Sequence, residues 1–214
     1  MENDNYLITP GITPLSRRLR ALIGACVLAA FTSLSCACAQ LHAAPQPTPV
    51  AAAGASLPSS HASADVIQPQ GEPGSCSARG SGRFALPDAH CTPGAIDPAV
   101  TQANLSSTIC RSGYTRTVRP PRSVTAAEKR ASMRTYSDTG PTSAYEYDHL
   151  VPLELGGARN DPRNLWPQPG RTPNPKDALE NRLHDMVCAG ELGLAAAQKR
   201  IARDWVAQYR HLFG

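Results

Sequence analysis

The sequence predicts an α+β domain in which a short hairpin and the helix after it are flanked by additional helices and cross-linked by disulfides. Two short β-compatible segments, near residues 145–155 and 164–166, are separated by the turn-forming pair Gly156-Gly157. Helix-start signals precede several segments whose apolar residues recur at helical spacing. Four of the seven cysteines lie beyond the first forty residues, an even number that suits disulfides.

Residues 1–39 have the features of a signal peptide. Three arginines precede an apolar stretch over residues 21–34, and residues 37–39 read Ala-Cys-Ala, which fits a cleavage site. The stretch is shorter than the roughly 20 residues of a membrane-spanning helix. We therefore expect a secreted, periplasmic or cell-envelope protein without stable membrane insertion. A Sec signal, a twin-arginine (Tat) signal and a lipoprotein anchor all remain open.

Residues 40–75 are rich in Ala, Pro and Ser, and we expect a disordered, flexible linker because so few large apolar residues cannot offset the entropy of ordering. The folded domain is then expected over residues 76–214. Its cysteines predict two disulfides in an exported domain, with all three pairings open, and their spacing disfavours a zinc site. These are Cys76, Cys91, Cys110 and Cys188.

The first part of the domain is expected to contain two helices and a strand. Asp97-Pro98 is a helix start, so a helix is predicted from there to Ile109. Alternating residues over 114–118 predict a short strand. Thr125 and Glu128 have the spacing of a capping box, which predicts a helix to about Tyr136.

The hairpin follows. Residues 145–155 are β-compatible, but Pro152 indicates an irregular or edge strand. Residues 164–166 form the second extended piece, after which Pro167, Pro169 and Pro173 are expected to hold the chain in a loop.

Two helices complete the prediction. Asn174-Pro175 is a cap followed by a proline and begins a helix to about Cys188, which Gly190 ends. The last helix is predicted over residues 194–213. Its apolar residues recur at helical spacing and are interpreted as core, as Trp166 is; they are Leu194, Ala197, Ile201, Trp205 and Leu212.

Asp148 and His149 stand next to each other on the first strand of the hairpin, a pair of side chains suited to phosphodiester hydrolysis. Water needs a base to take its proton, and an imidazole with a pKa near 6.5 suits that task. A carboxylate can hold a divalent cation that stabilises the charge developing on the phosphate. Neighbouring strand residues point to opposite faces, so the pair can share a site only where the strand is bulged or bent.

The segment D-H-L-V-P-L-E-L-G-G at 148–157, followed by N-L-W-P at 164–167, resembles the HNH (ββα-metal) endonuclease family, and in particular its small secreted bacterial members. The resemblance covers about residues 145–188. It implies a ββα-metal core and a secreted, nonspecific, metal-dependent endonuclease. The alternative is a catalytically weak scaffold of this type that binds nucleic acid or the cell envelope.

The resemblance also implies residue roles. Asp148 becomes a metal ligand, His149 the general base, and Asn164 a brace that orients the histidine. Asn174 fits the last position, where it would be a second ligand, although an Asn before a proline is equally well explained as a helix cap. Asp177 and, as a weaker alternative, His184 share its helical face.

The expected cofactor is one divalent metal ion, Mg²⁺ or Mn²⁺, because the candidate ligands are mostly oxygen donors. Zn²⁺ or Ni²⁺ would suit the site better if His184 were a ligand. No small-molecule cofactor is expected, and the protein is expected to be a monomer.

Nucleic acid, with DNA favoured, is the expected partner. The net charge of +4 is compatible with it. Basic residues near the Asp-His pair are candidates for sequence-independent phosphate contacts, and more basic residues lie upstream of it, between Arg116 and Arg134. The candidates are Arg159, Arg163, Arg171, Lys176 and Arg182.

Overall fold

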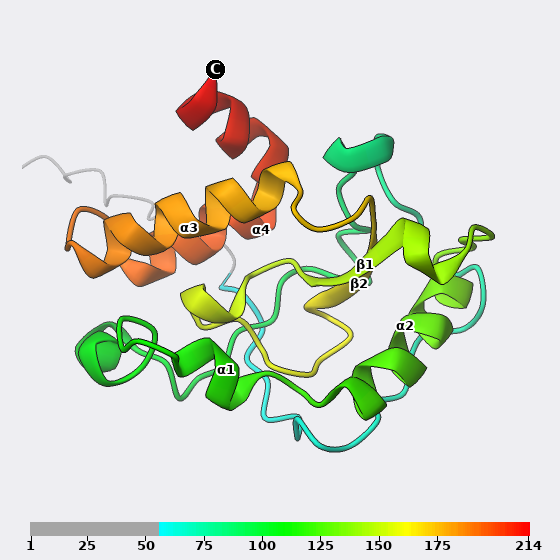
Figure 1. Ribbon diagram of the computed structural model, residues 1–214, viewed down its shortest axis with the longest axis horizontal. Helices are drawn as coiled ribbons and strands as arrows, with labels where there is room; N and C mark the ends of the chain where they lie inside the picture. The colour runs from blue at the N-terminus through cyan, green and yellow to red at the C-terminus, as the bar shows by residue number, and fades with distance from the viewer. Residues whose placement is uncertain (1–55) are drawn as a thin grey trace, which may run out of the picture. The chain divides into compact units, whose positions relative to one another are not determined.

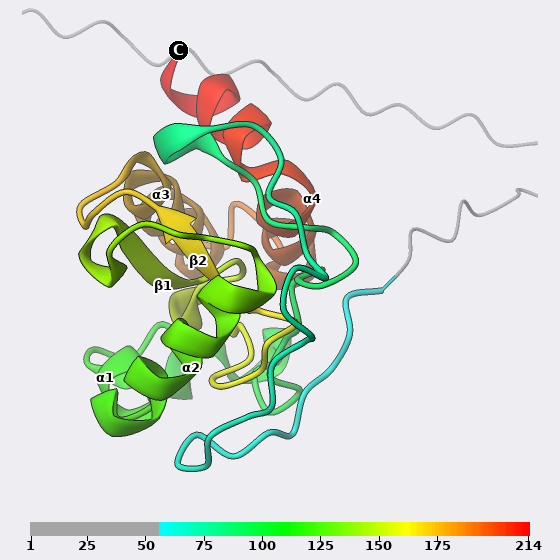
Figure 2. The same cartoon turned by 90° about the vertical axis from the view of Figure 1, so that its right-hand side faces the viewer.

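The computed structural model describes residues 56–214, so the predicted signal peptide and most of the predicted linker lie outside the described residues. The described chain mixes helices with one two-stranded antiparallel sheet (Figures 1 and 2). Its helices and strands, in order, are α1 (Tyr114–Val118), α2 (Arg122–Thr135), β1 (Tyr145–His149), β2 (Leu165–Pro169), α3 (Pro175–Cys188) and α4 (Leu194–Phe213).

The sheet lies between two groups of helices. α3 and α4 lie side by side on one side of it, and α2 packs against β2 on the other (Figures 1 and 2). The pairing runs without interruption from Tyr145 opposite Pro169 to His149 opposite Leu165. The bulge that would have brought Asp148 and His149 to one face is therefore not present; instead β1 ends at His149.

Pro167 and Pro169 belong to β2 rather than to the predicted loop. A two-stranded sheet leaves one side of each strand without a partner, and a proline is tolerated there because no ladder hydrogen bond is lost. Pro152 follows the strand and precedes a single 3-10 turn over Leu153–Leu155.

α3 begins as predicted. The Asn174 side chain accepts a hydrogen bond from the Lys176 amide at 2.8 Å, and the Asp177 carboxylate accepts one from the Asn174 amide at 2.9 Å. This reciprocal capping satisfies free N–H groups of the first turn, and Pro175 occupies the position that needs no N–H. The cap therefore orients the helix directly beside the end of β1.

The main core lies where α3 and α4 meet the segment after β1. Leu155, Leu183 and Ile201 are fully buried there. The predicted stripe of α4 is buried except for Leu212, which is partly exposed, and the helix is interrupted at Asp204. Trp166 is fully buried in a second, smaller core and so is a packing residue, as expected.

In the first part of the domain two predictions are wrong, and a third, the helix to about Tyr136, is right except for its start. In place of the predicted helix from Asp97 to Ile109 there is a 3-10 helix over Gln102–Ser107; Asp97 accepts a hydrogen bond from the Ala99 amide and pairs with Arg159. Residues 114–118 form helix α1, since Tyr114 and Val118 are four residues apart and both buried. α2 begins at Arg122, so Thr125 and Glu128 lie inside it.

Residues 56–75 lie against the domain, although we expected them to be part of a flexible linker. Ser59 pairs with Ile96, and the Gln68 amide donates to buried Glu128 at 2.7 Å. Thr135 donates to the Gly71 carbonyl at 2.7 Å. Composition failed here because this segment is ordered by main-chain hydrogen bonds rather than by burial of its own apolar side chains.

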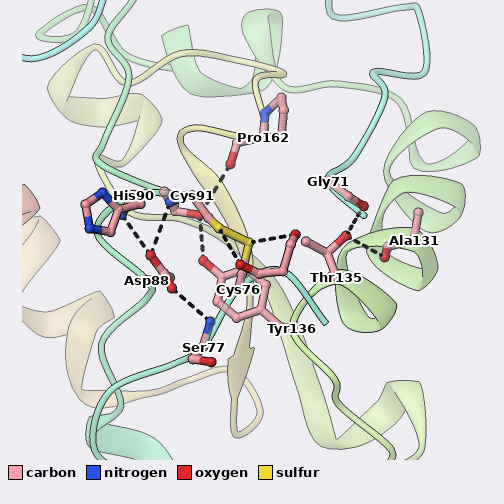
Figure 3. Close-up of a disulfide and its surroundings, with 12 residues drawn as sticks. Gly71, Cys76, Ser77, Asp88, His90, Cys91, Ala131, Thr135, Tyr136 and Pro162 are labelled. Atoms are coloured by element: carbon pink, nitrogen blue, oxygen red, sulfur yellow. Dashed lines mark hydrogen bonds between the residues drawn. A yellow bond between two sulfur atoms is a disulfide. The ribbon is translucent and has the colours of Figure 1, made fainter. Parts of the chain in front are cut away.

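Both predicted disulfides are present, and the structure decides their pairing: Cys76 with Cys91, and Cys110 with Cys188. Figure 3 shows the first beside Tyr136, whose hydroxyl lies 2.8 Å from that of Thr92. Within residues 56–214, no helix is long and apolar enough to cross a membrane.

Candidate functional site

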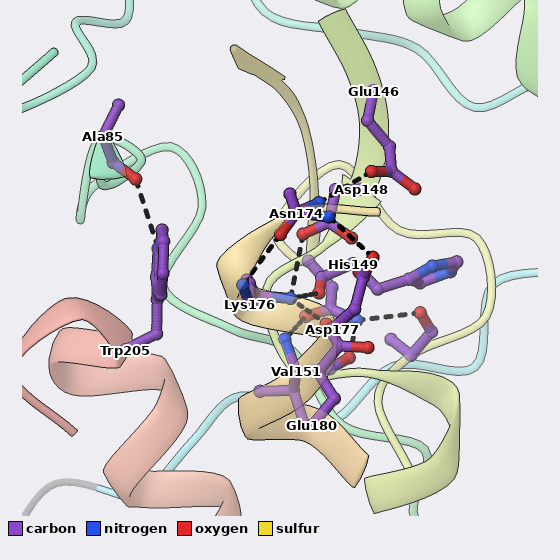
Figure 4. Close-up of polar contacts among 12 residues, drawn as sticks. Ala85, Glu146, Asp148, His149, Val151, Asn174, Lys176, Asp177, Glu180 and Trp205 are labelled. Atoms are coloured by element: carbon purple, nitrogen blue, oxygen red, sulfur yellow. Dashed lines mark hydrogen bonds and ion pairs between the residues drawn. The ribbon is translucent and has the colours of Figure 1, made fainter. Parts of the chain in front are cut away.

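The candidate site is the end of β1, where Asp148 and His149 are almost completely buried, with 9% and 7% of their surfaces exposed. Their side chains leave the strand in different directions (Figure 4). The Asp148 carboxylate lies against Lys176 of α3, whereas the imidazole of His149 extends to the loop that carries Arg159. No hydrogen bond joins the two side chains, so their joint action on one water and one cation stays a prediction.

His149 is held in one tautomer. Its Nε2 lies 2.9 Å from the Arg159 carbonyl oxygen, which can only accept, so Nε2 carries the proton and Nδ1 has the free lone pair. Burial, helped by the charges of Arg119 and Lys176, lowers the pKa of His149 to about 4 against the opposing effect of the Arg159 carbonyl. The imidazole is therefore neutral near pH 7, the form required of a base.

Asn164 braces the loop between the strands, as expected. Its amide nitrogen donates to the carbonyls of Val151 and Ala158 at 2.9 and 3.0 Å, and its side-chain oxygen accepts from the Val151 amide at 2.9 Å. Asn164 is fully buried. By joining the end of the first strand to the loop before Arg159, it holds the carbonyl that fixes the His149 ring.

Lys176 is wholly buried, so the prediction that it contacts phosphate at the surface is wrong. Its Nζ donates to the main-chain oxygen of His149 at 2.7 Å and lies 2.9 Å from Asp148 Oδ2, at an angle that makes an ion pair rather than an aligned hydrogen bond. It also pairs with Glu180, one helical turn along. Burial alone would lower the pKa of Lys176, but the two carboxylates raise it.

Glu146 is a residue of the site that the sequence analysis missed. It lies two residues before Asp148, so both side chains are on one face of β1. Its Oε2 accepts a hydrogen bond from the Asn174 side chain at 2.8 Å. Burial and the nearby charge of Asp148 raise the pKa of Glu146, as does Asp177. The alternation along the strand was the signal that could have found it.

The predicted metal ligands are only partly brought together. Asn174 and Asp177 lie near Asp148, but each uses a side-chain oxygen in the cap of α3. His184 lies further along α3, where Nε2 is 3.0 Å from the Ile109 carbonyl oxygen. It groups there with Cys110 and Cys188, whose sulfurs are joined in the disulfide and are not free thiolates.

Glu146 and Asp148 are the carboxylates at this end of β1 that could hold a divalent cation. The oxygens of Glu146 and Asp148 face the same region, and the raised pKa values of both show carboxylates crowded in a poorly solvated place. Lys176 offsets part of that charge. A divalent cation would offset more, and oxygen donors of this kind suit Mg²⁺ or Mn²⁺.

Two of the basic residues predicted to contact phosphate are neutralised by carboxylates. Arg159 pairs with Asp97 at 2.8 Å and Arg163 with Asp161 at 2.7 Å. Arg182 is exposed on α3. Arg171 lines an open cavity of about 840 Å³ beside β1, which we call the basic groove. Its lining residues are Arg119, Arg122, Thr125, Ala126, Lys129, Arg130, Thr142, Tyr145, Glu146, Tyr147, Arg171 and Thr172.

Comparisons with protein-family models, with curated proteins and with solved structures found no match for this chain. The fold and the site by themselves define the class of this protein. It is an α+β, disulfide-linked domain with a polar site at the end of a two-stranded sheet.

Proposed function

We propose that this protein is a metal-dependent endonuclease that hydrolyses nucleic-acid phosphodiester bonds, with His149 as the general base. The observation that carries the proposal is the state of His149: a neutral imidazole at the end of β1 whose Nε2–H is fixed by the Arg159 carbonyl. A fixed, neutral ring with a free Nδ1 is what proton transfer from water requires. The HNH-like spacing of Asp148, His149 and Asn164 supports the same reaction class.

The residues around the base have separate tasks in this proposal. His149 Nδ1 takes the proton of the attacking water, and the Arg159 carbonyl keeps the ring oriented and stabilises the imidazolium that forms. Asn164 keeps that carbonyl in place through its three main-chain hydrogen bonds. Lys176 holds the main-chain oxygen of His149, so the base cannot move away from α3.

Asp148 and Glu146 are the residues that would hold the cation. When bound, a divalent metal supplies positive charge to the phosphate and to the leaving oxygen. Asn174 orients Glu146 through its amide hydrogen bond. DNA is the favoured substrate, and two disulfides in one domain support a location outside the cytoplasm.

The proposal is tested by plasmid nicking with purified full-length protein in Mg²⁺ or Mn²⁺, with EDTA as the metal-free control. We expect His149→Ala to lower the cleavage rate by about 10²-fold or more, because it removes the general base. His211→Ala changes an exposed histidine at the end of α4 and should leave the rate unchanged. If protein with a native circular dichroism spectrum leaves the plasmid intact with every divalent metal tested, the proposal is wrong.

The second candidate is a catalytically weak scaffold that binds nucleic acid or the envelope. The observation that favours it is the buried ion pair between Asp148 and Lys176, which occupies the carboxylate that a metal would use. This function predicts binding to DNA without cleavage under any metal. Nicking that depends on both metal and His149 would exclude it.

A further inference from the structure

The basic groove gathers positive charge from three separate parts of the chain. Arg119 follows α1, Arg122 and Arg130 lie on α2 with Lys129, and Arg171 follows β2. Glu146 is the single acidic residue in its lining. Residues up to 52 positions apart in sequence, from Arg119 to Arg171, thus place five cations around one cavity.

The charges of these five side chains are not neutralised by carboxylates of the described residues. In the part of the chain that the structure describes, none of the five forms an ion pair, whereas Arg159, Arg163 and Lys176 all do. Lys129 donates to the Tyr145 carbonyl at 2.7 Å and Arg171 to the Ser143 carbonyl at 3.1 Å, contacts that place the side chains without neutralising them. Such a concentration of uncompensated charge favours a polyanionic ligand.

The groove adjoins the candidate base. Glu146 and Tyr147 line it and are the residues of β1 that precede Asp148 and His149. Arg119, which follows α1, lines the same cavity. A phosphate chain lying in the groove would therefore run along the residues of β1 that directly precede the Asp-His pair.

We propose that the basic groove binds the phosphodiester backbone of a nucleic-acid strand, and that it does so without reading sequence. Its charged groups are arginine and lysine side chains on helix α2 and on loops, which suit phosphates rather than base edges. Binding rests on this surface, while cleavage of the bound strand rests on the function proposed above. Of the basic residues near the Asp-His pair only Arg171 lines the groove; the other four cations come from the upstream group between Arg116 and Arg134.

The test is fluorescence anisotropy of a labelled DNA oligonucleotide with full-length protein in EDTA, so that binding is measured without cleavage. Arg122→Glu/Arg130→Glu reverses two exposed groove charges. We expect it to weaken binding at least about tenfold and to lower the slope of log K against log salt by about 2. The matched control is Arg200→Glu/Arg203→Glu, which makes the same charge change on exposed positions of α4 and should bind nearly as well as wild type.

Equal weakening by both double variants would overturn the proposal, because net charge alone would then explain binding. Unchanged binding by the groove variant would also overturn it, as would binding to anionic phospholipid vesicles with none to DNA. The two proposals fail separately. Groove-dependent binding without cleavage under any metal leaves the groove assigned and removes the nuclease. Metal-dependent cleavage with an unchanged KM in the groove variant would support the nuclease and exclude the groove as the binding surface.

Discussion

His149 shows how a side chain's surroundings decide its charge. The ring is buried beside Arg119 and Lys176, and the hydrogen bond to the Arg159 carbonyl does not compensate, so its pKa falls to about 4. An imidazole in water would be partly protonated at pH 6. This one remains neutral there, so the Nδ1 lone pair stays unprotonated over the whole neutral range, and the same lowering makes Nδ1 a weaker base than an imidazole in water.

The lowered pKa predicts how stability depends on pH. Between pH 4 and 6.5 the unfolded chain binds a proton at His149 that the folded chain does not, so stability falls as the pH falls through this window. The loss attributable to His149 is up to about 3 kcal/mol. Urea unfolding at pH 4.5 and 7 should show a smaller pH effect in His149→Gln than in wild type. Equal pH effects in both proteins would contradict the assignment.

Lys176 is the second residue whose surroundings decide its role. Replacing it by methionine leaves Asp148 and Glu180 as uncompensated carboxylates in a buried place. We expect Lys176→Met to destabilise the fold by about 3–5 kcal/mol at pH 8, and by less at pH 5, where the carboxylates can take up protons. Denaturant unfolding at the two pH values measures this difference.

Lys199→Met is the control for that experiment, since it removes an exposed lysine from α4. It should change stability by no more than about 0.5 kcal/mol at either pH. A Lys176→Met protein as stable as this control would show that the ammonium group does not hold β1 to α3.

At the level of elements, the connection between β1 and β2 determines the shape of the site. A Cβ on Gly157 would lie 1.7 Å from the Val151 carbonyl oxygen and 2.8 Å from Asn164 Nδ2. The close approach lets Asn164 bond both to Val151 near the start of the connection and to Ala158 in its middle. The glycine is therefore required by contact with the backbone rather than by turn geometry alone.

A pair of glycine substitutions tests this explanation. Gly157→Ala should unfold the domain or cost at least about 4 kcal/mol, because the backbone of Val151 must move and the Asn164 bonds must break. In Gly190→Ala the added Cβ has no atom within 4 Å. This substitution should therefore cost only the strain of a φ of +77°, about 1–2 kcal/mol of stability. Thermal unfolding of both variants compares them; similar costs would contradict the steric explanation.

Local signals predicted some elements well and others badly, for a physical reason. Asn174, Pro175 and Asp177 start α3 as predicted because a helix cap is completed by residues adjacent in sequence. Asp97-Pro98 has an equally good local signal, and Asp97 does accept a hydrogen bond from the Ala99 amide, but it also pairs with Arg159, 62 residues away, and the 3-10 helix begins only at Gln102. Pro167 and Pro169 looked like loop residues because a sequence does not show that β2 has one partner only.

At the level of the whole molecule, the two disulfides close loops of very different length. Cys76 and Cys91 are separated by 15 residues, and Cys110 and Cys188 by 78. The second joins the end of α3 to the segment before α1, so it ties together the two parts of the chain that flank the site. Chain-entropy reasoning assigns more stability to the longer loop.

Removing each disulfide by a pair of Cys→Ser substitutions should reveal that order. Loss of the Cys110–Cys188 bond is expected to cost about 4–5 kcal/mol and loss of the Cys76–Cys91 bond about 3 kcal/mol. Chemical denaturation of the two variants under identical conditions gives the comparison. A larger cost for the shorter loop would show that local contacts, such as those around Tyr136, outweigh loop closure.

The sequence by itself determined the class of fold, the presence of two disulfides, the cap of α3, the stripe of α4 and the brace formed by Asn164, since each depends on neighbours in the chain or on a residue pattern. Tertiary structure alone decided the disulfide pairing, the burial of Lys176, the place of Glu146 beside Asp148 and the gathering of five cations in the basic groove. Those features depend on which distant segments meet, and the free energy of a charge depends on what lies around it in space rather than on its position along the chain.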